Sequence, residues 1–237
     1  MKKKRILILG GSSDIGISLI EELLKEKNLE IYAHCHSKIN NLKNFKKKNI
    51  KIFKNDFSVI NDQNFNNELK KIFNLRFDYF VNLTGYISKS NFLNFKIDDQ
   101  IKTLKVNVII PNLIISKIIR KMLNNKFGRI VNCSSIGVKF GGGSNTYNYS
   151  LSKFASEFIP YNFKEWAKRN VLINNLRIGV TNTKLHKKIG KNIKLRTKLI
   201  PINRAAETIE VVKFIKFLLS KDNSYTTGQT ISISGGE

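Results

Sequence analysis

Residues 6–23, ILILGGSSDIGISLIEEL, decide how this chain folds. A short apolar run ends at Leu9 in a loop with two glycines and two serines, and an amphipathic segment resumes from Ile15. Glycine allows a tight turn, and a helix that begins directly behind it presents unpaired N–H groups and the positive end of its dipole. The stretch therefore predicts a strand, a glycine turn and a helix that together can bind an anionic group.

Each residue of this loop has an expected part in that arrangement. Gly10 permits the turn, and Gly16 lets the helix pack closely on the sheet. Ser12 and Ser13 can cap the helix or donate to a phosphate. Asp14 would repel a phosphate, so we expect its carboxylate to point to solvent, where its charge favours the helix dipole. A strand-to-helix turn with a structural role alone is the alternative.

The alternation of short apolar runs and amphipathic segments continues along the chain. Further strands are expected at 29–34, 49–53, 78–83, 128–135, 171–178 and 229–234, with helices over 61–74, 98–124, 150–168 and 207–220. Repeated strand and helix predict a parallel sheet covered on both faces. We expect an α/β protein with a doubly wound, three-layer Rossmann-type fold and a single, mostly parallel sheet of about seven strands. Its ligand site should lie at the carboxyl ends of the strands.

Length and composition exclude several kinds of protein. The 237 residues contain no Pro/Gly/Ser-rich linker, which predicts a single domain over 1–237. No apolar run approaches the ~20 residues of a membrane span, and the run after the lysine-rich start stops at Leu9, so we expect a cytoplasmic protein without membrane association. Cys35 and Cys133 lack metal-ligand spacing and are interpreted as buried free thiols, with no metal site.

The formal net charge of +25 raises the question of nucleic-acid binding. The positive charge is spread along the chain, as in KNFKKKNIKIFKND at 43–56, without a known nucleic-acid-binding motif or the interleaved aromatic residues of a single-strand binder. We therefore expect no specific nucleic-acid partner, although the charge favours acidic ligands or partners in general.

The segment YNYSLSK at 147–153 carries the sharpest chemical signal. Tyr149 and Lys153 are four residues apart and share one face of a helix, where an ammonium stabilises a neighbouring phenolate. A free tyrosine has a pKa of ~10, and a pKa near 7 needs roughly 4 kcal/mol of preferential stabilisation of the anion. Lys153 and a bound nicotinamide cation could together supply it. Such a tyrosine can exchange a proton with a carbonyl oxygen as hydride is transferred at the carbon.

The chain resembles the short-chain dehydrogenase/reductase family over almost its whole length. The resemblance rests on seven motifs in the family's order: LGGSSDIG at 9–16, NLTG at 82–85, VN at 106–107, SSIG at 134–137, YSLSK at 149–153, LRIGVTNT at 176–183 and GQTISISGG at 228–236. The chain departs from the family at Leu9, where threonine is usual, at Asp14, where glycine is usual, and at Arg177, where alanine is common.

The resemblance implies a catalytic set of four residues. Tyr149 is the expected acid/base, and Lys153 is expected to lower its pKa while holding the nicotinamide ribose. Ser135 would hydrogen-bond the substrate oxygen, with Ser134 as the alternative. Asn107 would hold a water that connects Lys153 to solvent; an asparagine that braces a helix kink is the alternative.

The implied cofactor is a nicotinamide dinucleotide. The residues expected to bind it are Gly10, Ser12, Ser13, Asp14, Ile15, Gly16, His36, Ser37, Asp56, Asn82, Gly85, Tyr149, Lys153, Gly179, Thr181 and Thr183. Asn82 and Gly85 would lie beside the adenosine ribose, and Thr183 would contact the carboxamide. Asp56 would meet the adenine edge, and a loop-capping role is its alternative.

The end of the second strand indicates which dinucleotide is preferred. An acid there would accept bonds from the ribose 2′-hydroxyl and repel a 2′-phosphate. Cys35 occupies this place, no acid follows before Asp56, and His36, Ser37 and Lys38 could donate to a phosphate. NADP(H) is therefore preferred, with NAD(H) possible; a solvated lysine-rich loop is the alternative interpretation.

The substrate and the assembly are less defined by the sequence. The family's substrate lid falls around 184–200, where Lys184, His186, Lys187 and Lys188 make it basic. This favours a polar or anionic, sugar-like small molecule. A 3-oxoacyl group on an acidic carrier protein is the alternative, and a non-catalytic dinucleotide-binding module is a further one. The resemblance also implies a homotetramer or homodimer, with 98–124 and 150–168 as contact surfaces.

Overall fold

The computed structural model describes residues 3–45, 49–61, 67–88, 92–184 and 193–237. Seven parallel strands form one sheet in the order β3-β2-β1-β4-β5-β6-β7. The strands are β1 (Lys4–Leu9), β2 (Leu29–Cys35), β3 (Ile50–Lys54), β4 (Tyr79–Asn82), β5 (Gly128–Ser135), β6 (Val171–Ile178) and β7 (Thr230–Ile233). The doubly wound α/β fold predicted from the sequence is confirmed.

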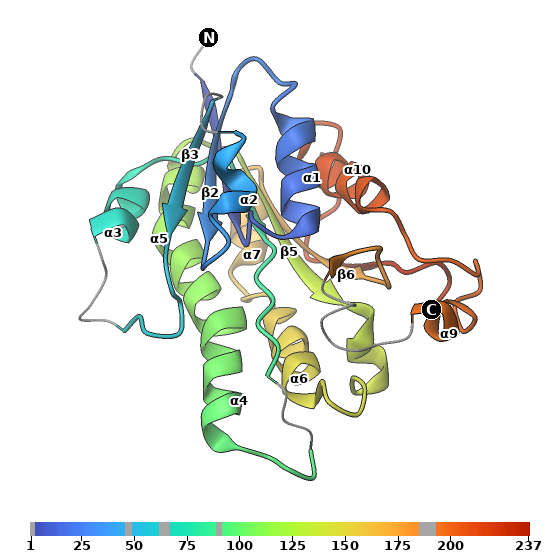
Figure 1. The fold of residues 1–237 in the computed structure, drawn as a ribbon. Coiled ribbons are helices and arrows are strands. Elements are labelled where there is room, and N and C mark those ends of the chain that lie inside the picture. Colours follow the sequence, from blue (N-terminus) through green and yellow to red (C-terminus); the bar gives the residue numbers. More distant parts are fainter. Residues whose placement is uncertain (1–2, 46–48, 62–66, 89–91, 185–192) are drawn as a thin grey trace.

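Helices cover both faces of the sheet (Figure 1). Their bounds are α1 (Asp14–Leu23), α2 (Asn40–Lys43), α3 (Asn67–Asn74), α4 (Ile97–Leu104), α5 (Ile110–Asn124), α6 (Tyr147–Ser156), α7 (Phe163–Ala167), α9 (Ile193–Thr197) and α10 (Thr208–Leu219). A π-helical turn over Lys105–Ile109 joins α4 to α5, and a 3₁₀ turn over Ile136–Phe140 follows β5.

The core has two halves because side chains alternate across a strand. On β1, Ile6 and Ile8 face the half formed with α1 and α10, whereas Leu7 and Leu9 face the half formed with α3 and α5. These side chains are fully buried on both faces. An apolar run without polar alternation is what a strand in the middle of a covered parallel sheet requires.

One expected helix was wrong. The predicted helix over 150–168 is two helices, because α6 ends at Ser156 and α7 begins at Phe163. Pro160 lies between them; its ring removes a backbone N–H, and proline disfavours helical geometry at the residue before it. In the expected helix over 61–74, residues 62–66 lie outside the described residues, and α3 covers the rest.

The fold creates a crevice where the strand order reverses. β1 pairs with β2 on one side and with β4 on the other, so the connections that leave their carboxyl ends diverge. The carboxyl ends of β4, β5 and β6 continue this edge. The described part of the chain contains no helix that is long and apolar enough to cross a membrane.

Candidate active site

The glycine turn after β1 is shaped so that only glycine fits. Gly10 has a φ of +71°, and a Cβ there would lie 2.7 Å from the backbone oxygen of Leu83. A Cβ on Gly16 would lie 2.6 Å from the backbone oxygen of Gly11. Ser13 caps α1 by accepting a hydrogen bond from the Gly16 N–H at 3.1 Å, and its hydroxyl donates to the Gly10 carbonyl at 2.8 Å. The sequence-based prediction of a strand, glycine turn and capped helix is confirmed.

Asp14 does not point freely into solvent as expected. Its carboxylate accepts a hydrogen bond from the backbone N–H of Lys184 at 2.6 Å. This bond joins the first turn of α1 to the segment after β6, and it orients the negative charge toward that segment. The remainder of the basic stretch, including His186, Lys187 and Lys188, lies outside the described residues.

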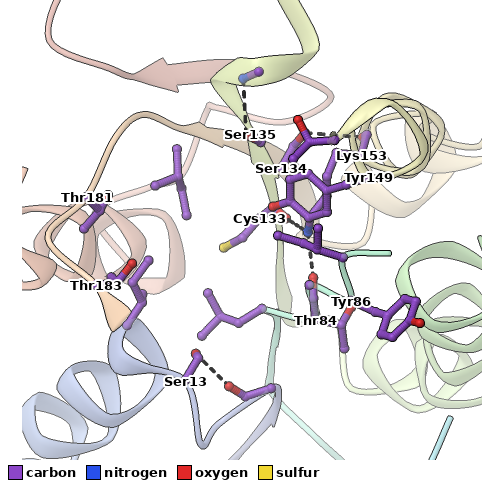
Figure 2. A pocket seen from close by; sticks show the side chains of 18 of the residues that line it. Ser13, Thr84, Tyr86, Cys133, Ser134, Ser135, Tyr149, Lys153, Thr181 and Thr183 are labelled. Atoms are coloured by element: carbon purple, nitrogen blue, oxygen red, sulfur yellow. Dashed lines mark hydrogen bonds between the residues drawn. The ribbon is translucent and has the colours of Figure 1, made fainter. Parts of the chain in front are cut away.

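Three of the four candidate catalytic residues, Ser135, Tyr149 and Lys153, lie together at the carboxyl end of β5 (Figure 2). Tyr149 and Lys153 come from α6, and the Lys153 Nζ lies 5.8 Å from the centre of the Tyr149 ring. Ser135 ends β5, and its side chain hydrogen-bonds to the Tyr149 side chain. Lys153 is buried and donates to the carbonyls of Thr84 at 2.7 Å and Cys133 at 2.6 Å. The spacing read from the sequence therefore places the phenol and the ammonium together.

The geometry separates the two serine candidates. Ser134 is buried, and its hydroxyl donates to the backbone carbonyl of Lys153 at 3.3 Å. Ser135 also accepts from the Gly137 N–H at 3.2 Å and is the serine that contacts the phenol. This arrangement favours Ser135 for the bond to a substrate oxygen.

Burial shifts the pKa values of Tyr149 and Lys153. Burial raises the pKa of Tyr149 to about 12, although the hydrogen bond with Ser135 opposes the shift. Burial lowers the pKa of Lys153 to about 8. Burial therefore disfavours both charged forms, the phenolate of Tyr149 and the ammonium of Lys153. The expected lowering of the Tyr149 pKa by Lys153 thus needs a further positive charge, as a nicotinamide cation would provide.

Asn107 braces the π-helical turn in the structure. Its side-chain oxygen accepts from the Tyr86 N–H at 2.8 Å, and its amide nitrogen donates to the Tyr86 carbonyl at 2.9 Å and to the Ser152 hydroxyl at 2.9 Å. The side chain is fully buried. These bonds match the bracing alternative, because the amide holds the loop after β4 against α6.

A pocket of about 1050 Å³ joins the glycine turn to Tyr149. The sequence-predicted residues that line it are Gly10, Ser12, Ser13, Asp14, Ile15, His36, Ser37, Asp56, Gly85, Ser135, Tyr149, Lys153, Gly179, Thr181 and Thr183. Gly16, Asn82 and Asn107 were also expected in the site but are not among the residues that line this pocket. The Asn82 side chain accepts from the Thr84 N–H and hydroxyl, at 3.1 and 2.7 Å, and so shapes the turn that offers a carbonyl to Lys153.

Sequence reasoning missed several pocket residues. His34 and Thr84 line the side near the glycine turn, and Phe140, Leu195 and Leu199 contribute apolar surface elsewhere in the pocket. No short motif marks the apolar three, because they come from a 3₁₀ turn and from the region of α9. A signal for His34 does exist, since a histidine inside an otherwise apolar strand is unusual.

The pocket fits a nicotinamide dinucleotide. The glycine cradle that a Cβ would fill lies at the N-terminus of α1, where backbone N–H groups and the helix dipole favour a pyrophosphate. Asp56 accepts from the Ser58 N–H at 2.9 Å and lies 3.3 Å from the His36 Nε2, so it caps its loop while it faces the pocket. On the opposite wall, the Gly179 N–H is bonded to the Ile233 carbonyl at 2.9 Å, which holds the turn that carries Thr181 and Thr183.

His34 predicts a measurable loss of stability in acid. Burial lowers the pKa of His34 to about 4, below its ordinary 6.5. Between these values the unfolded chain binds more protons than the folded chain, so the free energy of unfolding falls as the pH drops from 6.5 toward 4. At pH 5 this loss is about 2 kcal/mol. Urea unfolding at pH 7 and pH 5 tests this. On going from pH 7 to pH 5, the free energy of unfolding of His34→Asn should increase by about that much relative to the unsubstituted chain. If the difference between the two proteins were the same at both pH values, the lowered pKa of His34 would be wrong.

Comparisons with known proteins find relatives in sequence and in fold. A family model described as Enoyl-(Acyl carrier protein) reductase matches residues 57–237. The chain is 34% identical over 185 residues to the 3-oxoacyl-(acyl-carrier-protein) reductase FabG of Aquifex aeolicus (strain VF5), which covers 76% of this chain and 74% of that relative. A 3-oxoacyl (acyl-carrier-protein) reductase from Agrobacterium tumefaciens C58 with NADP bound has a TM-score of 0.84 and 22% identity, covering 100% and 95% of the two chains. A 4-hydroxyisoleucine dehydrogenase complexed with NADH has a TM-score of 0.86 and 24% identity, covering 99% and 98%.

Proposed function

The chain belongs to the short-chain dehydrogenase/reductase family and is an NAD(P)-dependent oxidoreductase, and from this we propose that it reduces the 3-oxo group of an acyl thioester to a 3-hydroxyl group. The observation that carries the proposal is the 34% identity to a 3-oxoacyl-(acyl-carrier-protein) reductase over three quarters of the chain. The comparisons thus favour the alternative substrate over the sugar-like one that the basic lid suggested.

The pocket lining supports an acyl substrate independently. Phe140, Leu195 and Leu199 line the pocket and expose 57%, 61% and 73% of their surface, so they offer apolar contact to a chain that enters there. Arg196 also lines the pocket, but Glu237 pairs with it and neutralises its charge. A neutral acyl chain fits this wall better than a sugar or a carboxylate does.

The proposed mechanism uses three side chains of this protein. When bound, the dinucleotide supplies a hydride to the carbonyl carbon. The Tyr149 hydroxyl donates a proton to the carbonyl oxygen, and the Ser135 hydroxyl beside it hydrogen-bonds the same oxygen and orients it. Lys153 stays protonated at pH 7, because its pKa of about 8 is above that pH, and it stabilises the phenolate that remains. Carbonyl, hydride and proton together give the alcohol.

A substrate panel tests the proposed function. The disappearance of NADPH absorbance is measured with acetoacetyl-CoA, with crotonyl-CoA and with oxidised nucleotide sugars. We expect turnover of acetoacetyl-CoA, because the Tyr149 and Ser135 hydroxyls are placed for an oxygen rather than for a carbon–carbon double bond. Turnover of crotonyl-CoA or of a sugar, with none of acetoacetyl-CoA, would overturn the proposal.

We propose NADPH as the preferred dinucleotide. At the end of β2, Cys35 is buried where an acid would repel a 2′-phosphate, and His36, Ser37 and Lys38 line the pocket directly after it. Asp56 faces the same region but is paired with His36. A phosphate there gains charge-assisted hydrogen bonds that a hydroxyl does not.

Lys38→Glu tests this preference. A carboxylate at position 38 repels a 2′-phosphate, so the KM for NADPH should rise about tenfold while the KM for NADH changes little. The matched control is Lys43→Glu, which makes the same charge change on α2 outside the pocket lining. Equal changes for both dinucleotides in the Lys38 variant would show that only overall charge matters.

A homotetramer or homodimer is also a proposal. Exposed apolar side chains lie on the two segments named from the sequence: Ile101 and Ile109 on 98–124, and Phe154 and Phe158 on 150–168, each more than half exposed. Apolar surface of this kind is typical of subunit contacts.

The expected single domain with a lid around 184–200 stays a prediction, because residues 185–192 lie outside the described residues.

A further inference from the structure

His34 lies buried between two loops that line the pocket. It is the penultimate residue of β2 and is 4% exposed. Its Nδ1 accepts a hydrogen bond from the backbone N–H of Gly10 at 3.3 Å, and its Nε2 lies 2.9 Å from the backbone oxygen of Asn55. A carbonyl only accepts, so Nε2 carries the proton and Nδ1 is bare. The two loops therefore fix a single neutral tautomer of the ring.

Further contacts fix the position of the ring. It stacks on Phe57, with ring centres 4.0 Å apart and an angle of 6° between the planes. The backbone oxygen of His34 also accepts from the Gly11 N–H at 2.8 Å. Side chain and backbone of this residue thus hold two successive residues of the glycine turn.

The two loops serve different parts of the proposed dinucleotide site. Gly10 belongs to the turn proposed for the pyrophosphate, and Asn55 precedes Asp56, which is proposed for the adenine edge. The turn and the loop after β3 come from chain segments more than forty residues apart, and the His34 ring hydrogen-bonds to both. Neither ring nitrogen hydrogen-bonds to a residue of α6, which carries Tyr149 and Lys153.

We infer that His34 is a positioning residue that holds the glycine turn and the loop after β3 at the spacing needed to bind the dinucleotide. The inference rests on the proposed function, because it assumes that this pocket holds NADPH. It predicts that replacing His34 weakens NADPH binding without slowing turnover once the site is saturated.

Three substitutions separate the two hydrogen bonds. In His34→Asn the side-chain oxygen can replace Nδ1 as the acceptor for Gly10. In His34→Gln the longer amide can replace Nε2 as the donor to Asn55 but leaves the Gly10 N–H unpaired. His34→Phe keeps an aromatic ring on Phe57 and loses both bonds.

NADPH fluorescence titration, hydrogen exchange and steady-state kinetics provide the readouts. We expect the Kd for NADPH to rise about tenfold in His34→Phe and His34→Gln, and by less than about threefold in His34→Asn. Exchange of the Gly10 amide should accelerate in the first two variants and not in the third. At saturating NADPH, kcat should stay within about twofold of the unsubstituted enzyme.

Tyr32→Phe is the matched control. Tyr32 lies two residues earlier on β2 and is equally buried, and its hydroxyl accepts from Lys51 at 3.1 Å away from the pocket lining. This variant should bind NADPH normally. If His34→Asn bound no better than His34→Gln, or if His34→Phe bound like the unsubstituted protein, the inference would be wrong. Absence of NADPH binding by the unsubstituted protein would instead refute the proposed function; if His34→Phe does not fold, the comparison of Asn with Gln decides.

Discussion

Tyr149→Phe is expected to lower kcat for acetoacetyl-CoA reduction about a thousandfold while leaving the Kd for NADPH within about twofold. The phenol is the proposed proton donor, and phenylalanine keeps the ring but has no proton to give. Because burial raises the pKa of Tyr149 to about 12, the hydroxyl is protonated at every pH used for the assay. The substitution therefore removes a proton donor that stays protonated across the pH range of the assay.

A nearby tyrosine provides the control for this experiment. Tyr147 precedes Tyr149 by two residues on α6, and its ring packs edge-on against Phe92, with centres 4.8 Å apart. Tyr147→Phe removes a hydroxyl from the same helix but not from the pocket lining. It should retain normal kcat. If Tyr149→Phe turned over acetoacetyl-CoA as fast as Tyr147→Phe does, Tyr149 would not be the proton donor.

Lys153→Met is expected to lower kcat about a hundredfold. The ammonium lies 5.8 Å from the centre of the Tyr149 ring. At an effective dielectric constant of about 20, loss of a nearby positive charge removes on the order of 3 kcal/mol of phenolate stabilisation, which corresponds to about two powers of ten in rate. The substitution also leaves the buried carbonyls of Thr84 and Cys133 without the donor they share. Steady-state kinetics at saturating NADPH would measure the loss.

The stability of the same variant has a distinct pH signature. Burial lowers the pKa of Lys153 from 10.5 to about 8, so the unfolded chain binds the extra proton between these values. The free energy of unfolding of the unsubstituted protein should rise through this window, relative to Lys153→Met, by about 3 kcal/mol. Lys164→Met is the control, because Lys164 lies on α7 with its ammonium over the exposed Tyr161 ring. If the difference in free energy of unfolding between Lys153→Met and the unsubstituted protein did not change with pH, the lowered pKa of Lys153 would be wrong.

The fold was largely readable from the sequence because its elements are locally consistent. The apolar runs GRIVNCSS and VLINNLRI coincide with β5 and β6 at both ends. The break at Pro160 was also visible in the sequence, but the apolar spacing on either side suggested one continuous helix. The π-helical turn at Lys105–Ile109 has no such local signal, since one extra residue in a helical turn depends on what the helix packs against.

In the site, too, the features set by local sequence were predictable and those set by distant contacts were not. Tyr149 and Lys153 were found because four residues of spacing on one helix determine their relation. The tautomer of His34 depends on Gly10 and Asn55, which belong to other strands' connections. The pKa of Tyr149 likewise depends on burial beneath segments remote in sequence, so the sequence predicted the pair but not that burial raises the pKa of the phenol and lowers that of the ammonium.

The π-helical turn makes the length of its helix as important as the residues in it. Each residue of a helix advances it by about 100°, and the turn at Lys105–Ile109 holds one residue more than an α-helical turn would. Deleting a single residue there would restore regular geometry but rotate α4 against α5. Lys102 would leave the pocket wall that it now lines, and Asn107 would lose its hydrogen bonds to the Tyr86 backbone. Variants of this segment should therefore tolerate exchanges of side chains far better than changes in the number of residues.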